Sequence, residues 1–267
     1  MDRHRVEPGS KFRIDKVDPS STAGWKVGKG KREETLEAMS RQLGELQTLL
    51  WAEHRHKVLI VLQGMDTSGK DGTISHVFLG INPQGVKVAN FRAPTPDELD
   101  HDFLWRVHSQ VPGKGEIVIW NRSHYEAVLA ERVHELVPPE EWELHYDQIN
   151  DFERLLAETG TTILKFLLHI DPDEQKKRLQ QRLDDPSKSW KLSLADLVDR
   201  KLWKRYMEAY QDAIERTSTR HAPWYVVPAN KKWYRNLVVA STLVDALKHL
   251  KMKLPRPAAD LRGIVIE

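Results

Sequence analysis

The stretch VLIVLQGMDTSGKDGT, Val58–Thr73, decides the fold of this chain. Its apolar run predicts a buried strand, which ends in a glycine loop that leads into a helical pattern. The spacing Gly64-x-x-x-x-Gly69-Lys70 is that of a P-loop, in which glycines let successive backbone N–H groups point toward a phosphate. The start of the following helix adds its positive dipole end, and Lys70 supplies a mobile cation. The stretch therefore predicts a phosphate-binding loop.

The loop departs from the usual motif in two ways. The residue after Lys70 is Asp71 instead of Ser or Thr, so the first hydroxyl comes at Thr73, and Asp66 places a carboxylate inside the loop. That carboxylate opposes phosphate binding unless it holds Mg²⁺, which prefers oxygen ligands. We favour a magnesium ligand over the alternative, a turn that Asp66 caps through an Asx hydrogen bond. The loop residues expected to contact phosphate are Gly64, Thr67, Ser68, Gly69, Lys70, Asp71, Gly72 and Thr73.

The composition is that of an ordinary globular protein of 267 residues, with 40% hydrophobic and 30% charged residues. The net charge of +2 implies no global attraction to nucleic acid. The absence of cysteine excludes disulfides and thiolate metal sites. No apolar run approaches the roughly 18 residues of a membrane span, and the N-terminus MDRHRVEPGS lacks the apolar core of a signal peptide. We therefore expect a cytoplasmic protein whose partners include neither membrane nor nucleic acid.

Apolar runs alternate with helical patterns along the chain, which implies parallel β-α-β units with helices on both faces of a sheet. We predict an α/β, P-loop kinase-like three-layer fold with a mostly parallel five-stranded sheet. Residues 1–30 are expected to form an arm, and residues 31–267 a single domain with a helical lid at about 173–200. The strands are expected at 57–63, 86–90, 116–120, 161–170 and 224–227. The helices are expected at 33–54, 71–79, 96–110, 125–136, 139–158, 173–183, 203–217 and 232–250.

The third predicted strand runs into Asn121-Arg122-Ser123-His124-Tyr125-Glu126. In P-loop enzymes the end of this strand faces the phosphates, and an acid there usually helps to hold Mg²⁺. Asn121 can still receive a metal-bound water through its amide oxygen, and the alternative is a cap at the strand end. Arg122 is a candidate phosphate clamp, because its planar fork pairs with two oxygens; the alternative is a surface salt bridge.

Together with further motifs, these residues make the chain resemble the polyphosphate kinase 2 family. The motifs cover almost the whole chain in the expected order, at Gly64–Thr73, Phe91–Arg106, Asn121–Glu126, Arg178–Asp196 and Pro228–Arg235. The resemblance implies a phosphotransferase that moves the terminal phosphate of inorganic polyphosphate onto a nucleotide. It also implies that polyphosphate lies along the P-loop side, while the acceptor nucleotide enters from the opposite side beneath a lid.

Residues 123–126 read Ser-His-Tyr-Glu, where many family members that use nucleoside diphosphates read Ser-Trp-Tyr-Asn and carry Asp in place of Asn121. The chain is therefore similar to the subgroup that phosphorylates both AMP and ADP, and so makes ATP from AMP in two steps. The resemblance further implies a homodimer or homotetramer. We expect Mg²⁺ as the cofactor, with Mn²⁺ as the alternative.

Two arginines of the predicted lid lie one helical turn apart, Arg178 and Arg182, so both project from the same face. This arrangement can close two guanidinium groups onto phosphates, and the alternative is pairing with Asp184 or Asp185. The predicted catalytic set is therefore Asp66, Lys70, Asn121, Arg122, Arg178 and Arg182, with Asp66 and Asn121 positioning the metal.

The acceptor nucleotide is expected to meet a separate set of side chains. Trp190 and Lys191 can bring an aromatic face and a charge into the cleft, unless Trp190 simply packs under the lid. Asp196 either touches the metal or caps a helix. Glu126 either holds a metal-bound water at AMP or is an ordinary first-turn glutamate. The residues assigned to the nucleotide are Arg92, Glu126, Arg132, Trp190, Lys191 and Asp196.

Three basic residues begin the last predicted helix, Lys231, Lys232 and Arg235. The helix dipole disfavours cations at this end, so a bound polyanion is one explanation and a solvated face is the other. We assign Arg122, Lys231 and Arg235 to polyphosphate alongside the loop.

Two other functions compete with polyphosphate-dependent transfer. One is a nucleoside monophosphate kinase that uses ATP, against which stand Asp66, Asp71 and the Asn121-Arg122 pair. The other is a polyphosphate-binding regulator without turnover, which has no need of a lid. The sequence favours in-line transfer from polyphosphate to AMP or ADP, in which Lys70 and the arginines spread the charge on the moving phosphate.

Overall fold

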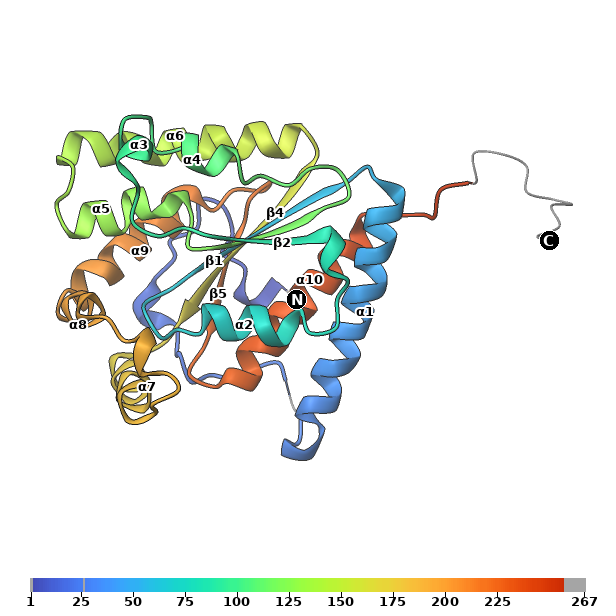
Figure 1. Ribbon diagram of the computed structural model, residues 1–267, viewed down its shortest axis with the longest axis horizontal. Coiled ribbons are helices and arrows are strands. Elements are labelled where there is room, and N and C mark those ends of the chain that lie inside the picture. Colours follow the sequence, from blue (N-terminus) through green and yellow to red (C-terminus); the bar gives the residue numbers. More distant parts are fainter. Residues whose placement is uncertain (1, 26, 257–267) are drawn as a thin grey trace, which may run out of the picture.

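The computed structural model describes residues 2–25 and 27–256, and its core is a five-stranded sheet between two layers of helices (Figure 1). The strand order is β2-β3-β1-β4-β5, and every pairing is parallel. The predicted α/β three-layer fold is therefore confirmed, with a sheet that is wholly and not just mostly parallel. The strands span β1 Lys57–Gln63, β2 Val86–Asn90, β3 Ile117–Asn121, β4 Thr161–His169 and β5 Trp224–Pro228.

Both faces of the central strand are covered, which explains its unbroken apolar run. Leu59 and Val61 belong to the core on one face of the sheet. That core is completed by α6 (Pro139–Glu158) and α9 (Trp203–Thr217). The neighbours of Leu59 along β1 point to the opposite core, under the three helices α1 (Arg32–Glu53), α2 (Lys70–Val77) and α10 (Lys232–His249). Figure 1 shows these layers above and below the sheet.

The register of the sheet brings the predicted motifs together. Leu62 near the end of β1 pairs with Asn121 at the end of β3, and Gln63 pairs with Leu167 of β4. The loop that follows β1 and the segment that follows β3 therefore leave the same edge of the sheet. This is the edge at which parallel α/β proteins place their ligands.

Two predicted continuous helices are broken in the structure, which corrects the ranges 96–110 and 125–136. The first divides into α3 (Pro96–Leu99) and α4 (Trp105–His108), because the Asp102 carboxylate accepts from the backbone N–H groups of Leu104 and Trp105 and restarts the chain. The second divides where Leu129 adopts φ −109° and ψ −83°, which is not helical. Its parts are the 3₁₀-helix η5 (His124–Val128) and α5 (Ala130–Val133).

The predicted lid segment contains more helix than its sequence suggested. It comprises α7 (Pro172–Asp184), the 3₁₀-helix η6 (Ser189–Lys191) and α8 (Leu194–Lys201), which was not predicted. Other 3₁₀ turns lie at η1 (Asp2–His4), η2 (Ile14–Lys16), η3 (Lys29–Lys31) and η4 (Pro83–Gly85).

The N-terminal segment lies against β5 and the start of α10. The backbone N–H of Val6 donates to the Trp224 carbonyl at 2.8 Å, and the His4 ring lies 2.8 Å from the Tyr234 hydroxyl. The side chain of Asn230 donates to the Ser20 hydroxyl at 2.8 Å. None of the helices within 2–25 and 27–256 is long and apolar enough to cross a membrane.

Because His169 at the end of β4 is buried, we expect the free energy of unfolding to fall in acid. Burial lowers the pKa of this imidazole to about 4, below its ordinary value of 6.5. Between pH 6.5 and about 4, His169 is protonated in the unfolded chain but not in the folded chain, so the free energy of unfolding falls as the pH falls. The expected loss is about 3 kcal/mol of unfolding free energy at pH 4.

Urea denaturation at pH 7 and at pH 4.5 measures this dependence. His169→Gln is expected to show a shallower acid loss than the unmodified chain. The matched control is His221→Gln, at an exposed histidine, which should keep the full dependence. An equal acid loss in the His169→Gln variant would remove this histidine from the account.

Candidate active site

The loop after β1 has the backbone that its glycines predicted. Gly64 and Gly69 adopt φ +146° and +104°, a region that disfavours residues with a side chain. A Cβ at Gly64 would lie 2.7 Å from the Leu168 carbonyl oxygen, and a Cβ at Gly69 would lie 1.7 Å from Nη1 of Arg235. Glycine is therefore required at both ends, by conformation and by space.

Arg178 of α7 holds the back of this loop, and its contacts differ from the predicted one to a phosphate. The side chain is buried, and its Nη1 donates to the carbonyl oxygens of Thr67 and Ser68 at 2.9 and 3.1 Å. Its Nη2 donates to two carbonyls of the loop after β5, and its Nε donates to Glu174 at 2.7 Å. A guanidinium has five N–H groups, and these contacts use all of them. Arg178 therefore shapes the loop and has no donor left for a phosphate.

Arg235 of α10 is a second buried guanidinium behind the loop, with an exposed fraction of 2%. Its Nη1 lies 3.3 Å from the Ser68 carbonyl oxygen, and its Nε and Nη2 donate to the side-chain oxygen of Asn236. Across the part of the chain that is described, no carboxylate forms an ion pair with it. Burial, and then the charge of Arg178, lower the pKa of Arg235 to about 9. A buried cation without a partner anion favours a bound anion nearby.

Lys70 begins α2 and folds back over the loop. Its Nζ donates to the carbonyl oxygen of Gly64 at 2.6 Å and lies 3.5 Å from that of Met65. Burial and then the charge of Arg122 lower the pKa of this ammonium, and the carboxylate of Asp66 opposes them. Because Lys70 makes no ion pair within residues 2–25 and 27–256, it can turn toward an incoming phosphate without breaking one.

The P-loop residue Asp66 and Arg122, which follows β3, form an ion pair. Nη2 of Arg122 donates to Oδ1 of Asp66 at 2.9 Å, and Nη1 lies 3.8 Å from Oε2 of Glu126. These two carboxylates outweigh burial and raise the pKa of Arg122. Arg122 adopts φ +63°, an unusual conformation for a residue with a side chain, at the point where the chain leaves β3. The predicted salt-bridge alternative for Arg122 is thus present within the site and not on a remote surface.

The Asn121 side chain contacts a carboxylate and an amide, and neither contact was predicted. Its Nδ2 donates to Oδ1 of Asp71 at 2.8 Å and to Oδ1 of Asn90 at 2.9 Å. Lys191 of η6, in the predicted lid, lies 3.7 Å from Oδ2 of the same Asp71. The residue that replaces the usual Ser or Thr therefore joins the start of α2 to β3 and to the lid.

The lid residues divide between internal contacts and solvent. Arg182 pairs with Asp196 at 3.6 Å, so the predicted alternatives Asp184 and Asp185 are not its partners. Asp196 forms the capping box of α8 with Ser193, as one of its two predicted roles required. Burial, then the charge of Asp66, raise the pKa of Asp196.

Trp190 is 76% exposed, which excludes packing under the lid. Its indole N–H donates to the Ser187 carbonyl at 3.0 Å, and the Lys191 ammonium lies 5.2 Å from the ring centroid. An exposed aromatic ring beside a cation remains available to a base or a phosphate.

The two arginines assigned to the nucleotide lie in separate clefts. Arg92 lines a cleft of about 500 Å³ between β2 and α4, with the exposed Trp105. Arg132 lines a cleft of about 240 Å³, where its guanidinium lies 4.4 Å from the Trp142 ring centroid and 2.7 Å from Asp212. Burial acts to lower the pKa of Arg132, but its contacts with Tyr146 and Asp212 outweigh burial, so the pKa is raised. Lys231 is exposed at the start of α10 and is free to reach a polyanion.

The loop offers oxygen ligands suited to Mg²⁺. The hydroxyls of Thr67 and Ser68 are buried without a partner in the described chain, and the Asp66 carboxylate lies in the same loop. Residues 2–25 and 27–256 contain no group of three or more acidic or histidine side chains arranged around one metal position. Mg²⁺ usually binds through one or two carboxylates and fills its remaining positions with water and phosphate oxygens, so it does not need such a group.

Three neighbours of the site were not predicted from the sequence. Asn90 at the end of β2 holds Asn121, while Tyr206 and Tyr210 lie near Arg122 and Glu126. Burial raises the pKa of Tyr206 and of Tyr210. The spacing of the tyrosines by one helical turn was visible in the sequence, but nothing in it distinguished them from other core positions of α9.

Comparisons with known proteins agree on one family. A family model described as polyphosphate kinase 2 matches residues 26–255. The chain is 55% identical to the AMP/ADP-polyphosphate phosphotransferase of Meiothermus ruber, over 100% of both chains. It is 42% identical to the ADP-polyphosphate phosphotransferase of Rhodopseudomonas palustris, over 94% of this chain and 91% of that protein. The crystal structure of polyphosphate kinase 2 from Arthrobacter aurescens superposes with a TM-score of 0.93, at 49% identity, and covers 97% of this chain and 92% of that one.

Proposed function

The chain belongs to the polyphosphate kinase 2 family, and we propose that it transfers the terminal phosphate of inorganic polyphosphate to AMP and ADP, giving ADP and ATP. The observation that carries this proposal is the full-length similarity to an enzyme named for both acceptors. The resemblance stated from the sequence motifs is thereby confirmed. The geometry agrees, because a glycine loop with a mobile lysine and a buried, unpaired guanidinium behind it suits a chain of phosphates.

The transfer needs little covalent help from the protein. An oxygen of the acceptor phosphate attacks the terminal phosphorus in line, a new P–O bond forms, and the phosphoanhydride bond to the shortened polyphosphate breaks. The acceptor oxygen is already largely ionised near neutral pH, so no general base is required. Lys70 and Arg122 neutralise the charge on the moving group, and a closed lid excludes water.

We propose Mg²⁺ as the cofactor, with Mn²⁺ as the alternative, held by Asp66 and, through water, by Asn121. When bound, the cation neutralises phosphate oxygens and fixes their orientation. The support is the oxygen-rich loop and the side chain of Asp66, which among the described residues accepts a side-chain hydrogen bond from Arg122 alone. With a cation held by Asp66, the Arg122 guanidinium would be free to pair with a phosphate instead. A cytoplasmic location and a homodimer or homotetramer stay predictions from the sequence.

An assay without ATP tests the function. The protein is incubated with long-chain polyphosphate and either AMP or ADP, and nucleotides are separated by chromatography. We expect ADP and then ATP from AMP, and ATP from ADP. A parallel incubation without polyphosphate measures conversion of two ADP molecules to ATP and AMP by any contaminating kinase.

The same assay separates the competing functions. A nucleoside monophosphate kinase would form ADP from AMP only when ATP is added. A polyphosphate-binding regulator would bind the polymer with steep salt dependence and form no nucleotide. Either outcome would overturn the proposal. Product from ADP but none from AMP would keep the donor and correct the subgroup.

A further inference from the structure

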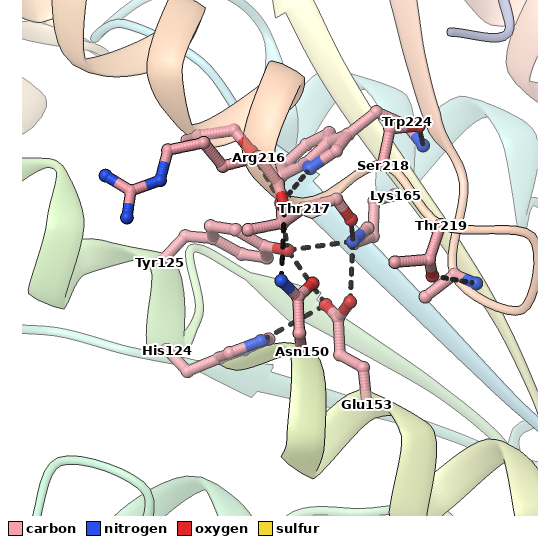
Figure 2. Close-up of polar contacts among 12 residues, drawn as sticks. His124, Tyr125, Asn150, Glu153, Lys165, Arg216, Thr217, Ser218, Thr219 and Trp224 are labelled. Carbon is pink, nitrogen blue, oxygen red and sulfur yellow. Dashed lines mark hydrogen bonds and ion pairs between the residues drawn. The ribbon is translucent and has the colours of Figure 1, made fainter. Parts of the chain in front are cut away.

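A fully buried ion pair lies behind the segment that carries Arg122 and Glu126. Lys165 of β4 and Glu153 of α6 have side chains with no exposed surface, and their N–O distance is 2.6 Å. Figure 2 shows the Lys165 ammonium among Glu153, Tyr125 and Thr217. Nζ donates to the Tyr125 hydroxyl and to the Thr217 carbonyl, each at 2.8 Å. All three of its N–H groups are therefore used, in three directions.

The charges in this network are set by their neighbours. Burial acts to raise the pKa of Glu153, but the Lys165 ammonium outweighs it, so the carboxyl is ionised at neutral pH. Burial lowers the pKa of His124, so the ring is neutral. Nε2 of His124 lies 3.3 Å from Glu153 and donates to it. One arrangement of protons thus accounts for the contacts of the ammonium, the carboxylate and Nε2 of the ring, while Nδ1 of His124 has no partner among the described residues.

The network fastens four separate parts of the fold to one short segment. The Tyr125 hydroxyl lies 3.0 Å from Glu153 and 2.8 Å from the Thr217 hydroxyl, and its one hydrogen can be donated to either. The indole N–H of Trp224 donates to that same Thr217 hydroxyl at 2.9 Å (Figure 2). Helices α6 and α9 and strands β4 and β5 therefore all meet η5. The contacts fix His124 and Tyr125 on the inner side of the chain.

The residues on either side of this anchor are partly exposed. Arg122 and Glu126 keep 39% and 26% of their side-chain surface exposed, whereas His124 has none. The Ser123 hydroxyl accepts from the Gln63 side chain at 3.0 Å and from the Tyr125 backbone at 3.1 Å, so the turn between them is also held. Directional hydrogen bonds therefore determine which side chains of this segment point inward and which point outward.

Stability alone does not account for such a pair. Replacing a buried ion pair with apolar residues of similar volume is often neutral or stabilising, because removing two charges from water is costly. Directional hydrogen bonds supply what apolar contacts lack, which is a fixed orientation. An orientation is what phosphoryl transfer requires of Arg122, since a misplacement of about 1 Å can cost a hundredfold in rate.

We propose that the Glu153–Lys165 pair is a positioning device for the reaction, acting through Tyr125 and His124 on Arg122 and Glu126. It rests on the proposed phosphotransferase function. All four inner residues are buried, so they act on the substrates only through Arg122 and Glu126, and the larger effect falls on the rate of transfer.

The test is Tyr125→Phe, which keeps the ring and removes the hydroxyl from Lys165. We expect kcat for ATP formation from ADP and polyphosphate to fall about 10- to 100-fold, while both KM values stay within about threefold. The matched control is Tyr234→Phe, which removes a buried hydroxyl from the Ala23 carbonyl on the opposite face of the sheet. The Tyr234→Phe variant should keep the native kcat, although its melting temperature falls by about as much as that of Tyr125→Phe. Equal kcat values for the two variants would overturn the proposal.

A second measurement asks whether Tyr125 acts through Arg122. In an Arg122→Ala background, Tyr125→Phe should change kcat by less than twofold, because the residue to be positioned is gone. A full 10- to 100-fold further loss in that background would contradict the mechanism of action.

The double variant Glu153→Leu/Lys165→Met serves if Tyr125→Phe does not fold. It removes both charges together, and we expect a folded protein with the same loss of kcat. A folded double variant with native kcat would overturn the proposal. If the unmodified chain forms no ATP from polyphosphate, the proposed function fails. This outcome differs from a Tyr125→Phe variant that keeps the native kcat, which would overturn only the positioning role.

Discussion

Lys70→Ala is expected to lower the rate of phosphate transfer about a thousandfold while the chain stays folded. The ammonium makes no ion pair within the described chain, and its nearest acceptor is the Gly64 carbonyl oxygen at 2.6 Å. Its removal therefore costs little stability. It also leaves the moving phosphate without the cation that the loop is built to present. Single-turnover transfer from polyphosphate to ADP measures the rate, and thermal melting checks the fold.

The matched control for Lys70 is Lys204→Ala. Lys204 is an exposed lysine of α9 that lies 3.9 Å from Glu208. Its loss removes the same charge from the protein and should leave transfer unchanged. Near-normal turnover in the Lys70→Ala variant would exclude this lysine from the chemistry.

Arg178→Met is expected to lower the free energy of unfolding by about 4 kcal/mol and to abolish transfer. The substitution removes the ion pair with Glu174 and leaves buried carbonyls unpaired on both sides, those of the P-loop and those of the loop after β5. Without the guanidinium, the two loops are no longer joined. Urea denaturation measures the stability, and its midpoint should fall with an unchanged slope.

Two further variants distinguish this structural role from a catalytic one. Arg178→Lys keeps the charge but offers three donors without a planar fork, so a large part of the loss should persist. Arg154→Met, at an exposed arginine that pairs with Asp151 at 2.9 Å, should change stability by less than about 0.5 kcal/mol. An Arg178→Met protein of native stability that had lost transfer would restore the sequence-based role on the phosphate.

Much of the fold follows from local patterns in the sequence. The apolar runs of the strands are long because helices cover both faces of the sheet, and a buried strand such as β1 can hardly be mistaken for a surface element. The P-loop was equally predictable, because the backbone at Gly64 and Gly69 adopts positive φ angles that favour glycine. The two broken helices were not predictable in the same way. In the first, the Asp102 carboxylate accepts from the backbone N–H of Leu104, and a new helix begins after α3.

The site was predicted less completely, for a physical reason. A motif shows which residues lie near the cleft, but not which of their donors are already occupied. Arg178 contacts the carbonyls of Thr67 and Ser68 more than a hundred positions away, and backbone acceptors leave no mark in a sequence. The inward turn of His124 and Tyr125 likewise depends on Glu153 of a distant helix. The lid pairing of Lys191 with Asp71 is a third contact of this kind.

The central claim is that the loop beginning at Gly64 holds inorganic phosphates and passes the last of them to a nucleotide. A crystal structure with a short polyphosphate and ADP, with divalent cations chelated to arrest transfer, tests it most directly. The account predicts a phosphate chain along residues 64–70 beside Lys70, with the nucleotide entering from the opposite side beneath the lid. Phosphates of an adenine nucleotide in that loop, with polyphosphate bound elsewhere, would contradict it.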